Sequence, residues 1–464
     1  MKKIPLLIVK CLCVMLPFIV FSVYAWGNFM AFADEESPYY VWNKEFTRTT
    51  QEKKYDVVIL GDSVANASYA PELLSDTTVN LALGGMTPVE NYYIFRDWLE
   101  HNEAPEHVFI SFQDLHLYMS DCFWSRAMYM HRFDFKDNVE VLRKAAKYGE
   151  ETIAVDGWVS DLIEYELFLP SKYVTSMMKG SFNQRLLKNT ERKGMMELHR
   201  GWYMGRSIAE HTDTEVESQD EYVVDPVYDE YYRGILDMCE QHGISVHIIR
   251  LPLSEMTTFG SEYDDQLYAY YEDLCSGYSD VSFDWYAEPY EKEMFMDYVH
   301  MNMHGTFKFS TFLKKQWPQC FDDTYSPGQI LAINDSLFEQ NKVEEWFGWM
   351  AGKDYTMLIC DEIGVVEEKL VPAAEKYGLE IVPYEADGAP GPVYAVSGLR
   401  ADSVRDLSLD MSSAEEWKLT IGQQEPVIWY PLKEGGLSVV IVDHLHQVVP
   451  VQRNFVYEEG FVAK

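Results

Sequence analysis

The stretch Tyr55-Asp-Val-Val-Ile-Leu-Gly-Asp-Ser63 decides the fold of this chain. Its first six residues form a short run rich in β-branched side chains, and Gly61-Asp62-Ser63 follows directly. Such a run is typical of a buried strand that enters a tight turn. Comparable runs occur later in the chain, and each predicts a further strand, at 78–83, 107–112, 245–251 and 281–286.

Longer segments with helical periodicity lie between or after these runs, at 88–101, 226–243, 261–277 and 306–317. Pro88 and Pro226 stand where the start of a helix tolerates proline, and Gly243 stands where helices commonly end. Strands that alternate with helices of this length form parallel sheets that are covered on both faces. We therefore predict an α/β domain built on a flavodoxin-like, doubly wound parallel sheet.

An insertion at about 120–225 separates the third strand from the fourth and shows no clear strand of its own. It contains helical patterns at 138–148 and 159–168 and a basic patch, which we define as Arg185, Lys188, Arg192 and Lys193. Insertions of this size beside the carboxyl ends of strands commonly shape a binding cleft, so we expect a helical cap. The charge pattern of the insertion favours a solvated surface over a partner site. If the substrate is nevertheless an acidic polymer, this basic patch is where we expect it to bind first.

A loop at 322–328, Asp-Asp-Thr-Tyr-Ser-Pro-Gly, marks a domain boundary. Beyond it the pattern predicts strands at 329–333 and 355–360, helices at 342–351 and 366–377, and then several short strands, among them 437–442 and 448–451. The expected organisation is a first α/β domain at 55–317, interrupted by the insertion, and a second, mixed α/β accessory domain at 328–464.

The charge balance excludes one large class of partner. The chain has 464 residues, with 38 Lys and Arg against 75 Asp and Glu, and its formal net charge is −37. Binding to nucleic acid needs a dense basic footprint, which this chain lacks, so nucleic acid is not an expected partner. The hydrophobic share of 47% is sufficient for packed cores and excludes a broadly disordered chain.

The N-terminal segment 1–33 carries Lys2, Lys3 and Lys10, followed by an uncharged apolar run at 11–33 that is long enough to cross a bilayer. Two interpretations stand: an uncleaved membrane anchor, or a secretory signal cleaved after Ala31-Phe32-Ala33. The apolar core of a signal spans only about 7 to 15 residues, which favours the anchor. The lysines then stay in the cytoplasm, and everything from Asp34 onward is extracellular on a single-pass cell-membrane protein. Secretion after cleavage is the alternative.

The cysteines and histidines predict neither a disulfide framework nor a metal centre. An odd number of cysteines at irregular spacing follows Asp34, and we expect free, buried thiols: Cys122, Cys239, Cys275, Cys320 and Cys360. No CxxC pair is present. His444 and His446 stand two apart in an expected turn, which is a poor zinc pattern. No metal and no cofactor are predicted.

A candidate catalytic triad comes from two distant parts of the sequence. Ser63 stands at the carboxyl end of the first strand, where open α/β sheets bind their ligands. Serine needs a base, and the base needs an orienting acid. Asp297-Tyr-Val-His300 follows the last strand of the sheet and offers both, because Asp297 can hold one nitrogen of His300 while the other faces Ser63.

Three short blocks resemble the SGNH (GDSL-type) hydrolase superfamily. Gly61-Asp-Ser63, Asn80-Leu-Ala-Leu-Gly-Gly85 and Asp297-x-x-His300-x-Asn302-x-x-Gly305 are similar to its blocks I, II and V, and the resemblance covers about 55–317 without the insertion. With the N-terminal segment, the chain is similar to the membrane-anchored AlgX-, AlgJ- and DltD-like branch, which acyl-modifies cell-surface polymers. The resemblance implies that Ser63 is the nucleophile, His300 the base and Asp297 its partner. It also implies that the backbone N–H of Ser63 and that of Gly84 or Gly85 stabilise the oxyanion.

The third block departs from the family pattern, Gly-x-Asn-Asp. Here the strand ends Ser111-Phe-Gln113-Asp114, so Gln113 is the candidate amide donor to the oxyanion hole. The resemblance implies an exported serine esterase or O-acyltransferase that acts on esters of a cell-surface glycan or cell-wall polymer through an acyl-serine. The polymer, the membrane and a membrane protein that donates acyl groups are the implied partners. A catalytically inactive SGNH-like protein that binds glycans or assists assembly is the alternative, because the missing asparagine can abolish turnover.

Overall fold

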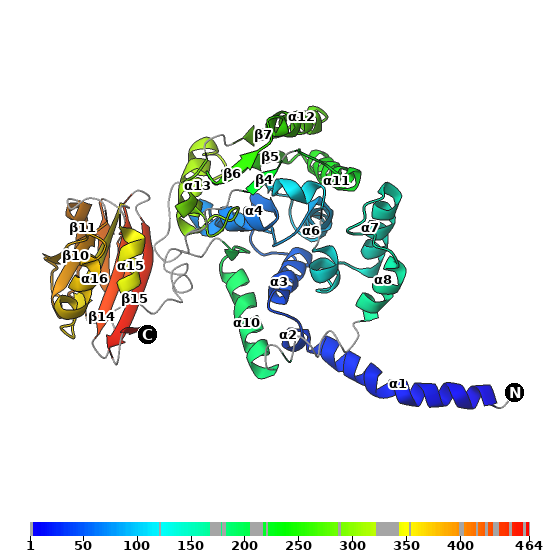
Figure 1. The fold of residues 1–464 in the computed structure, drawn as a ribbon, viewed down its shortest axis with the longest axis horizontal. Coiled ribbons are helices and arrows are strands. Elements are labelled where there is room, and N and C mark those ends of the chain that lie inside the picture. The colour runs from blue at the N-terminus through cyan, green and yellow to red at the C-terminus, as the bar shows by residue number, and fades with distance from the viewer. Residues whose placement is uncertain are drawn as a thin grey trace. The chain divides into compact units, whose positions relative to one another are not determined.

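The structure is a computed structural model of the whole chain, and its helices and strands are drawn in Figure 1. The residues that it describes are 3–119, 122–167, 178, 182–204, 217–219, 221–285, 289–321, 343–351, 354–398, 403–413, 416–422, 426–429, 436–444, 448–457 and 461–463. They form two compact units, the first extending to Thr306 and the second beginning at Phe307. This division lies inside helix α13 (Met303–Gln316), upstream of the boundary that the sequence predicts.

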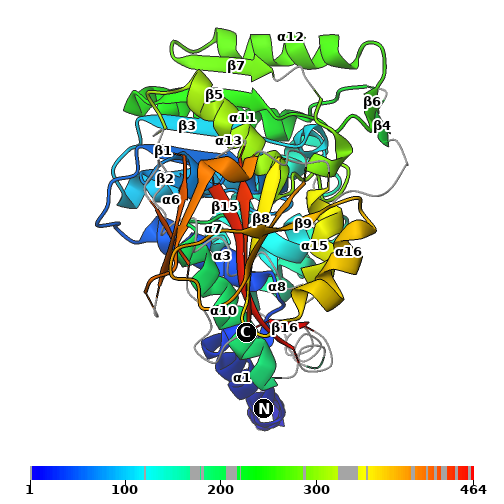
Figure 2. The ribbon, with the colours of Figure 1, turned by 90° about the vertical axis from the view of Figure 1, so that its left-hand side faces the viewer.

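A parallel sheet of five strands organises the first unit: β1 (Val57–Gly61), β2 (Thr78–Asn80), β3 (His107–Ser111), β5 (Ser245–Arg250) and β7 (Val281–Trp285). The strand order is β2-β1-β3-β5-β7, and every neighbouring pair is parallel. Figure 2 shows these strands stacked from β7 at the top to β2. The predicted α/β class with a parallel sheet is confirmed, and the order is compatible with a doubly wound arrangement.

Apolar side chains explain why the sheet is buried. All five residues of β1 are buried, so its two faces are both covered. On one face, Val58 and Leu60 of β1 join Val108 and Ile110 of β3 in a large core. The helices of this unit that accompany the sheet are α3 (Ser37–Arg48), α4 (Ser63–Ser68), α5 (Pro71–Leu74), α6 (Pro88–His101), α11 (Pro226–His242) and α12 (Tyr263–Ser276).

The predicted helix boundaries at proline and glycine are close to the observed ones. Helix α6 begins at Pro88 and α11 begins at Pro226. Thr87 and Glu90 form a capping box in front of α6, which fixes its first turn. Gly243 ends α11 with a φ of +67°, a left-handed conformation that glycine adopts without strain.

The insertion is mostly helical, as predicted, but it also contains a strand. Its elements are the π-helical segment η2 (Phe123–Met128), α7 (Phe135–Tyr148), α8 (Trp158–Leu167), α10 (Phe182–Leu198) and β4 (Glu217–Gln219). Strand β4 pairs in parallel with β6 (Thr257–Phe259), a ladder that the sequence did not indicate. Helices α7 and α8 share a core with α6 and α11.

At the N-terminus, helix α1 (Lys3–Gly27) is followed by the short helix α2 (Phe29–Phe32). Ala25, Ala31 and Phe32 are buried in a small cluster that also contacts Tyr129, so the end of α1 is packed against the first unit. Within the described residues, no helix combines the length and apolar character needed to span a membrane. The anchor and the extracellular location remain predictions.

The second unit is built on an antiparallel sheet with the strand order β16-β15-β14-β8-β10-β9. A smaller antiparallel sheet has the order β11-β12-β13. The strands are β8 (Tyr355–Asp361), β9 (Ile381–Tyr384), β10 (Val393–Ser397), β11 (Leu407–Asp410), β12 (Trp417–Ile421), β13 (Val427–Trp429), β14 (Leu437–Asp443), β15 (Val448–Tyr457) and β16 (Phe461–Ala463). The helices are α15 (Val343–Met350) and α16 (Val371–Glu375), which follows a π-helical turn, η5 (Val366–Leu370).

Two further predictions concern the second unit and the thiols. The strand predicted at 329–333 lies outside the described residues. The described cysteines after Asp34 are all free, as predicted; Cys239, Cys320 and Cys360 are buried, and Cys122 and Cys275 are partly exposed.

Candidate active site

The turn that presents Ser63 depends on Gly61. Strand β1 ends at Gly61, whose φ is +146°, and helix α4 begins at Ser63. A Cβ atom on Gly61 would lie 2.0 Å from the carbonyl oxygen of Ser111 on the neighbouring strand β3. Only glycine fits both the backbone angle and this close approach. The turn therefore places Ser63 at the carboxyl end of the sheet, as the sequence predicts.

Ser63, His300 and Asp297 lie in one chain of hydrogen bonds. The Oγ atom of Ser63 lies 2.7 Å from Nε2 of His300, and Nδ1 of His300 lies 2.7 Å from Oδ2 of Asp297. Because an ionised carboxylate can only accept, Nδ1 carries the proton, and Nε2 is free to accept the proton of Ser63. Ser63 is 7% exposed, so its hydroxyl is largely shielded from bulk water.

The His300 side chain, together with two backbone N–H groups, keeps the Asp297 carboxylate ionised. Its Oδ1 accepts hydrogen bonds from the N–H groups of Val299, at 2.9 Å, and His300, at 2.7 Å. Burial alone would raise the pKa of the Asp297 carboxyl, but the hydrogen bonds and the charge of His300 outweigh burial and hold the pKa below its usual value. A charged Asp297 stabilises the imidazolium that forms when His300 takes a proton.

The loop that carries Asp297 and His300 is closed on itself. Phe295 and Met301 form an antiparallel bridge, and the N–H of Met296 donates to the carbonyl of His300 at 2.9 Å. The N–H of Asn302 donates to the carbonyl of Met294 at 3.0 Å. These bonds fix the loop before α13 begins, so Asp297 and His300 are oriented by their own short segment.

Asp62 links the serine turn to the loop after β3. Its Oδ1 caps α4 by accepting from the N–H of Val64 at 3.0 Å. Its Oδ2 accepts from the N–H of Gln113 at 2.8 Å and lies 2.5 Å from Nδ1 of His116. Asp62 is fully buried. This one carboxylate thus sets the distance between Ser63 and the segment that contains Gln113.

The candidate oxyanion donors differ in whether their N–H groups already have a partner. No described residue accepts a hydrogen bond from the backbone N–H of Ser63, so this donor is available. The N–H of Gly84, in contrast, donates to the hydroxyl of Tyr203 at 3.2 Å. Gly84 can serve an oxyanion only after that bond opens. Gly85 has a φ of +70° and is buried against Arg126 and Cys122, where a Cβ would clash.

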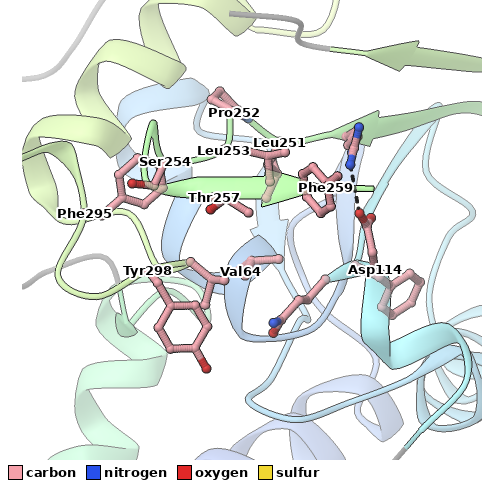
Figure 3. Close-up of a pocket in the computed structure, with 14 residues that line it drawn as sticks. Val64, Asp114, Leu251, Pro252, Leu253, Ser254, Thr257, Phe259, Phe295 and Tyr298 are labelled. Carbon is pink, nitrogen blue, oxygen red and sulfur yellow. Dashed lines mark hydrogen bonds and ion pairs between the residues drawn. The ribbon is translucent and has the colours of Figure 1, made fainter. Parts of the chain in front are cut away.

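The carboxamide of Gln113 remains a candidate hydrogen-bond donor to the oxyanion. Gln113 is partly exposed, and no described residue forms a hydrogen bond with its carboxamide. It also lines a pocket with a cavity volume of about 50 Å³, together with Val64, Tyr298 and Val299. Val64 follows Ser63 in the chain, and Val299 precedes His300, so two of the lining residues are sequence neighbours of the candidate triad. Figure 3 shows the side chains around the pocket.

The described insertion residues do not line this pocket, although Tyr203 reaches Gly84 from the insertion. The cap over the cleft remains a prediction. Part of the basic patch is also already paired. Arg192 forms an ion pair with Glu35 at 3.0 Å, and Lys193 forms one with Glu45. The first pair joins α10 to the segment before α3, and the second joins α10 to α3 itself. Both reduce the positive charge that the patch could offer to an acidic polymer.

Three residues that organise the site were missed from the sequence: Asn91, His116 and Tyr203. Each acts on a residue far away in the chain, respectively Gly61, Asp62 and Gly84. Nothing in their local sequence distinguishes them from ordinary helix or loop residues.

The two histidines of the second unit that the sequence analysis considered can be placed only in part. His444 lies 2.7 Å from the hydroxyl of Thr356, whereas His446 lies outside the described residues.

Comparisons with known proteins add little to this geometry. No protein-family model matches the chain, and no curated protein matches it. One matching solved structure is described as “The structure of a putative platelet activating factor from Streptococcus pneumonia”, with 13% identity. The match covers 64% of this chain and 98% of that chain, with a TM-score of 0.30. That score establishes neither a shared fold nor a shared function.

Proposed function

We propose that this protein is an SGNH-type serine hydrolase or O-acyltransferase that forms an acyl-Ser63 intermediate. The observation that carries the proposal is the unbroken series of hydrogen bonds from Ser63 through His300 to Asp297. Sequence blocks and geometry agree on the same three residues. The available N–H of Ser63 supplies one oxyanion donor, and the Gln113 carboxamide is the candidate for a second.

The reaction follows from the geometry of these groups. Ser63 Oγ attacks the ester carbonyl carbon while His300 Nε2 takes its proton, and the carbonyl oxygen becomes an oxyanion. The tetrahedral intermediate then expels the alcohol, which receives the proton from His300 and leaves acyl-Ser63. Water or an acceptor hydroxyl next gives its proton to His300 and attacks the acyl carbon. The second tetrahedral intermediate then breaks its bond to Oγ of Ser63, and His300 returns the proton to Oγ. Water as acceptor gives an esterase, and a sugar hydroxyl gives a transferase.

For the substrate, the proposal follows the family resemblance: an ester on a cell-surface glycan or cell-wall polymer. The protein would be exported and tethered by 1–33, and a membrane protein could supply the acyl group. A net charge of −37 disfavours capture of a polyanion by general electrostatics.

The test is active-site labelling of the full-length chain in mild detergent. We expect a fluorophosphonate probe to label the wild type at Ser63 and an aryl acetate to be hydrolysed. Ser63→Ala should lose both signals. Ser68→Ala is the matched control, since Ser68 is buried in the same helix but its hydroxyl bonds to the carbonyl of Val64. Absence of labelling and turnover in the wild type, or equal turnover in Ser63→Ala, contradicts the proposal.

Two observations favour a second candidate, an inactive glycan-binding or assembly protein. The N–H of Gly84 is engaged by Tyr203, and the third block lacks its asparagine. Glycan binding that survives Ser63→Ala, with no hydrolysis by the wild type, would support this function. A burst of released aryl alcohol, equal to the amount of protein, would eliminate it.

A further inference from the structure

The hydroxyl of Tyr203 competes with any substrate oxygen for the N–H of Gly84. This N–H donates to the phenol oxygen at 3.2 Å, which is close to the distance at which an N–H holds an oxyanion. One N–H cannot give a full hydrogen bond to two oxygens at once, because such a bond needs a nearly straight approach. Gly84 therefore becomes an oxyanion donor only when Tyr203 releases it.

Two tyrosines hold the two backbone polar groups of Gly84. The hydroxyl of Tyr40, a buried residue of α3, donates to the carbonyl of Gly84 at 2.9 Å, while Tyr203 accepts from the N–H. The bond from Tyr40 does not depend on the acceptor at the N–H. Gly84 can therefore keep its place while its N–H exchanges one acceptor for another.

The backbone of Tyr203 is fastened to α4, the helix that begins at Ser63. The N–H of Tyr203 donates to Oδ1 of Asn66 at 3.1 Å, and the indole of Trp202 donates to the carbonyl of Ala67 at 3.3 Å. Trp202 is fully buried, so this part of the insertion is anchored beside the serine turn. Release of Gly84 thus requires only a rotation of the Tyr203 side chain.

The ring of Tyr203 is held by Tyr39 of α3. The two rings are stacked, with centroids 3.9 Å apart and an angle of 16° between their planes. Both side chains are partly exposed, which leaves the ring of Tyr203 a direction in which to move. An aromatic stack and a single hydrogen bond are each modest in strength, so together they favour the closed position without locking it.

The charge of the competing oxygen decides when Tyr203 gives way. Burial raises the pKa of the Tyr203 phenol above its usual value, so the phenol is a neutral acceptor at pH 7. A hydrogen bond to an ionised acceptor is roughly twice as strong as one to a neutral acceptor. The oxyanion of a tetrahedral intermediate can therefore displace the phenol, whereas the neutral carbonyl of a bound ester gains little by doing so.

We propose that the Tyr203 hydroxyl is a latch on the N–H of Gly84, closed in the free protein and opened by the negative charge that develops on the substrate oxygen. This inference rests on the proposed function, because it needs an oxyanion formed by attack of Ser63. Tyr203 is a positioning residue in this scheme, since it acts through Gly84. Its removal should accelerate the reaction, which loss of a merely structural contact would not do.

The experiment measures the second-order rate of Ser63 labelling by a fluorophosphonate and kcat/KM for p-nitrophenyl acetate, with the full-length protein. Tyr203→Phe keeps the stacked ring and removes the acceptor, so both rates should rise about three- to tenfold, the value of one hydrogen bond. Tyr40→Phe is the matched control, because it also removes one hydroxyl from Gly84, but from the carbonyl side. There both rates should fall about two- to fivefold, since Gly84 loses a bond that fixes it.

Tyr39→Leu reaches the same state by a second route. It removes the aromatic stack and leaves the Tyr203 hydroxyl, so we expect both rates to rise about threefold. In the Tyr203→Phe background the same substitution should add less than about twofold, because the hydroxyl that the stack holds is already gone. Urea denaturation checks that each variant is folded, and Tyr39→Leu carries the test if Tyr203→Phe is not.

The outcomes separate the latch from the proposed function. Rates in Tyr203→Phe that equal or fall below those of the wild type overturn the latch, and so does an equal rise in Tyr40→Phe. In both cases, labelling of the wild type at Ser63 still upholds the proposed function. If the wild type is not labelled and cleaves no ester, the function and the latch both fall.

Discussion

The carboxamide of Asn91 binds both backbone polar groups of Gly61: its Oδ1 accepts from the N–H at 2.9 Å, and its Nδ2 donates to the carbonyl at 3.0 Å. Asn91 lies on α6, so this helix fixes the last residue of β1 before the Asp62-Ser63 turn. Both residues are fully or almost fully buried, so water cannot replace these bonds. The position of the proposed nucleophile thus depends on a side chain outside the triad.

We expect Asn91→Ala to lower the free energy of unfolding by about 2–4 kcal/mol, because it leaves buried polar groups of Gly61 without partners. It should also lower kcat, since the serine turn loses its support. Asn102→Ala is the control: Asn102 also bonds two backbone groups, of Gln51 and Thr47, but at the other end of α6. Urea denaturation and ester hydrolysis measure both effects. A kcat loss of equal size in Asn102→Ala would contradict a specific role for Asn91.

Gly61 itself should tolerate no side chain. Gly61→Ala places a Cβ 2.0 Å from the carbonyl oxygen of Ser111, so overpacking adds to backbone strain, and the loss of stability should exceed about 3 kcal/mol. Gly149→Ala is a matched control, because Gly149 has a φ of +77° but no atom within 4 Å of the added Cβ. There we expect about 1–2 kcal/mol. Equal losses in the two variants, measured by urea denaturation, would show that the contact with Ser111 is unimportant.

Asp297→Asn tests the orientation of His300. The amide would donate to Nδ1 and leave the proton on Nε2, where it blocks acceptance of the Ser63 proton. We expect kcat for an aryl acetate to fall by about 10⁴ while the fold is preserved. Asp237→Asn, an exposed carboxylate on α11, should leave kcat unchanged. Circular dichroism checks the fold, and a kcat within tenfold of wild type would refute the assigned role of Asp297.

Gln113→Ala tests whether the carboxamide stabilises the oxyanion. Loss of one such donor costs about 10² to 10³ in kcat, and we expect a value near 10² with little change in KM. The backbone N–H of Gln113 keeps its bond to Asp62 in this variant, so the loop stays in place. Gln51→Ala, whose carboxamide bonds only to backbone carbonyls near α3, serves as control. An unchanged kcat in Gln113→Ala would leave the N–H of Ser63 as the principal donor.

Much of the sheet could be predicted because its strands are continuous apolar runs bounded by glycine, proline or polar residues. The exceptions have physical reasons. The run at 78–83 yields only three residues of strand, because the Asn80 side chain bonds the N–H of Ala82 and draws the chain into a loop. The helix predicted at 366–377 becomes a π-helical turn and a short helix, and Pro372 lacks the N–H that a continuous helix needs.

The triad could be predicted for a similar reason: Ser63 and the Asp297/His300 pair each sit in a short motif beside a strand end. The supporting residues could not. Tyr203 reaches Gly84 from the insertion, 119 positions away, and nothing in its own segment indicates that contact. Such contacts are set by packing between distant segments, which local periodicity does not report.

An ion network centred on the buried Asp97 of α6 should make the first unit sensitive to acid. Asp97 pairs with Arg132 at 2.9 Å and Arg48 at 2.8 Å, and its side chain is 3% exposed. Burial raises the pKa of the Asp97 carboxyl, but Arg132 and the other guanidinium groups outweigh burial and lower the pKa to about 2. Since the folded pKa lies below the unfolded one, the network contributes its full stability above about pH 4 and loses it as pH falls towards 2.

Asp97→Asn should therefore cost about 2 kcal/mol at pH 7, which corresponds to the depression of its pKa from 3.8 to about 2. The difference between wild type and variant should shrink between pH 4 and pH 2 and vanish near the lower value. Urea denaturation at pH 7, 4, 3 and 2, followed by tryptophan fluorescence, measures it. Asp273→Asn removes an exposed partner of Arg233 and should cost less than about 1 kcal/mol at every pH. A wild-type advantage over Asp97→Asn that is the same at pH 2 and pH 7 would mean that the carboxylate charge of Asp97 is not what stabilises the fold.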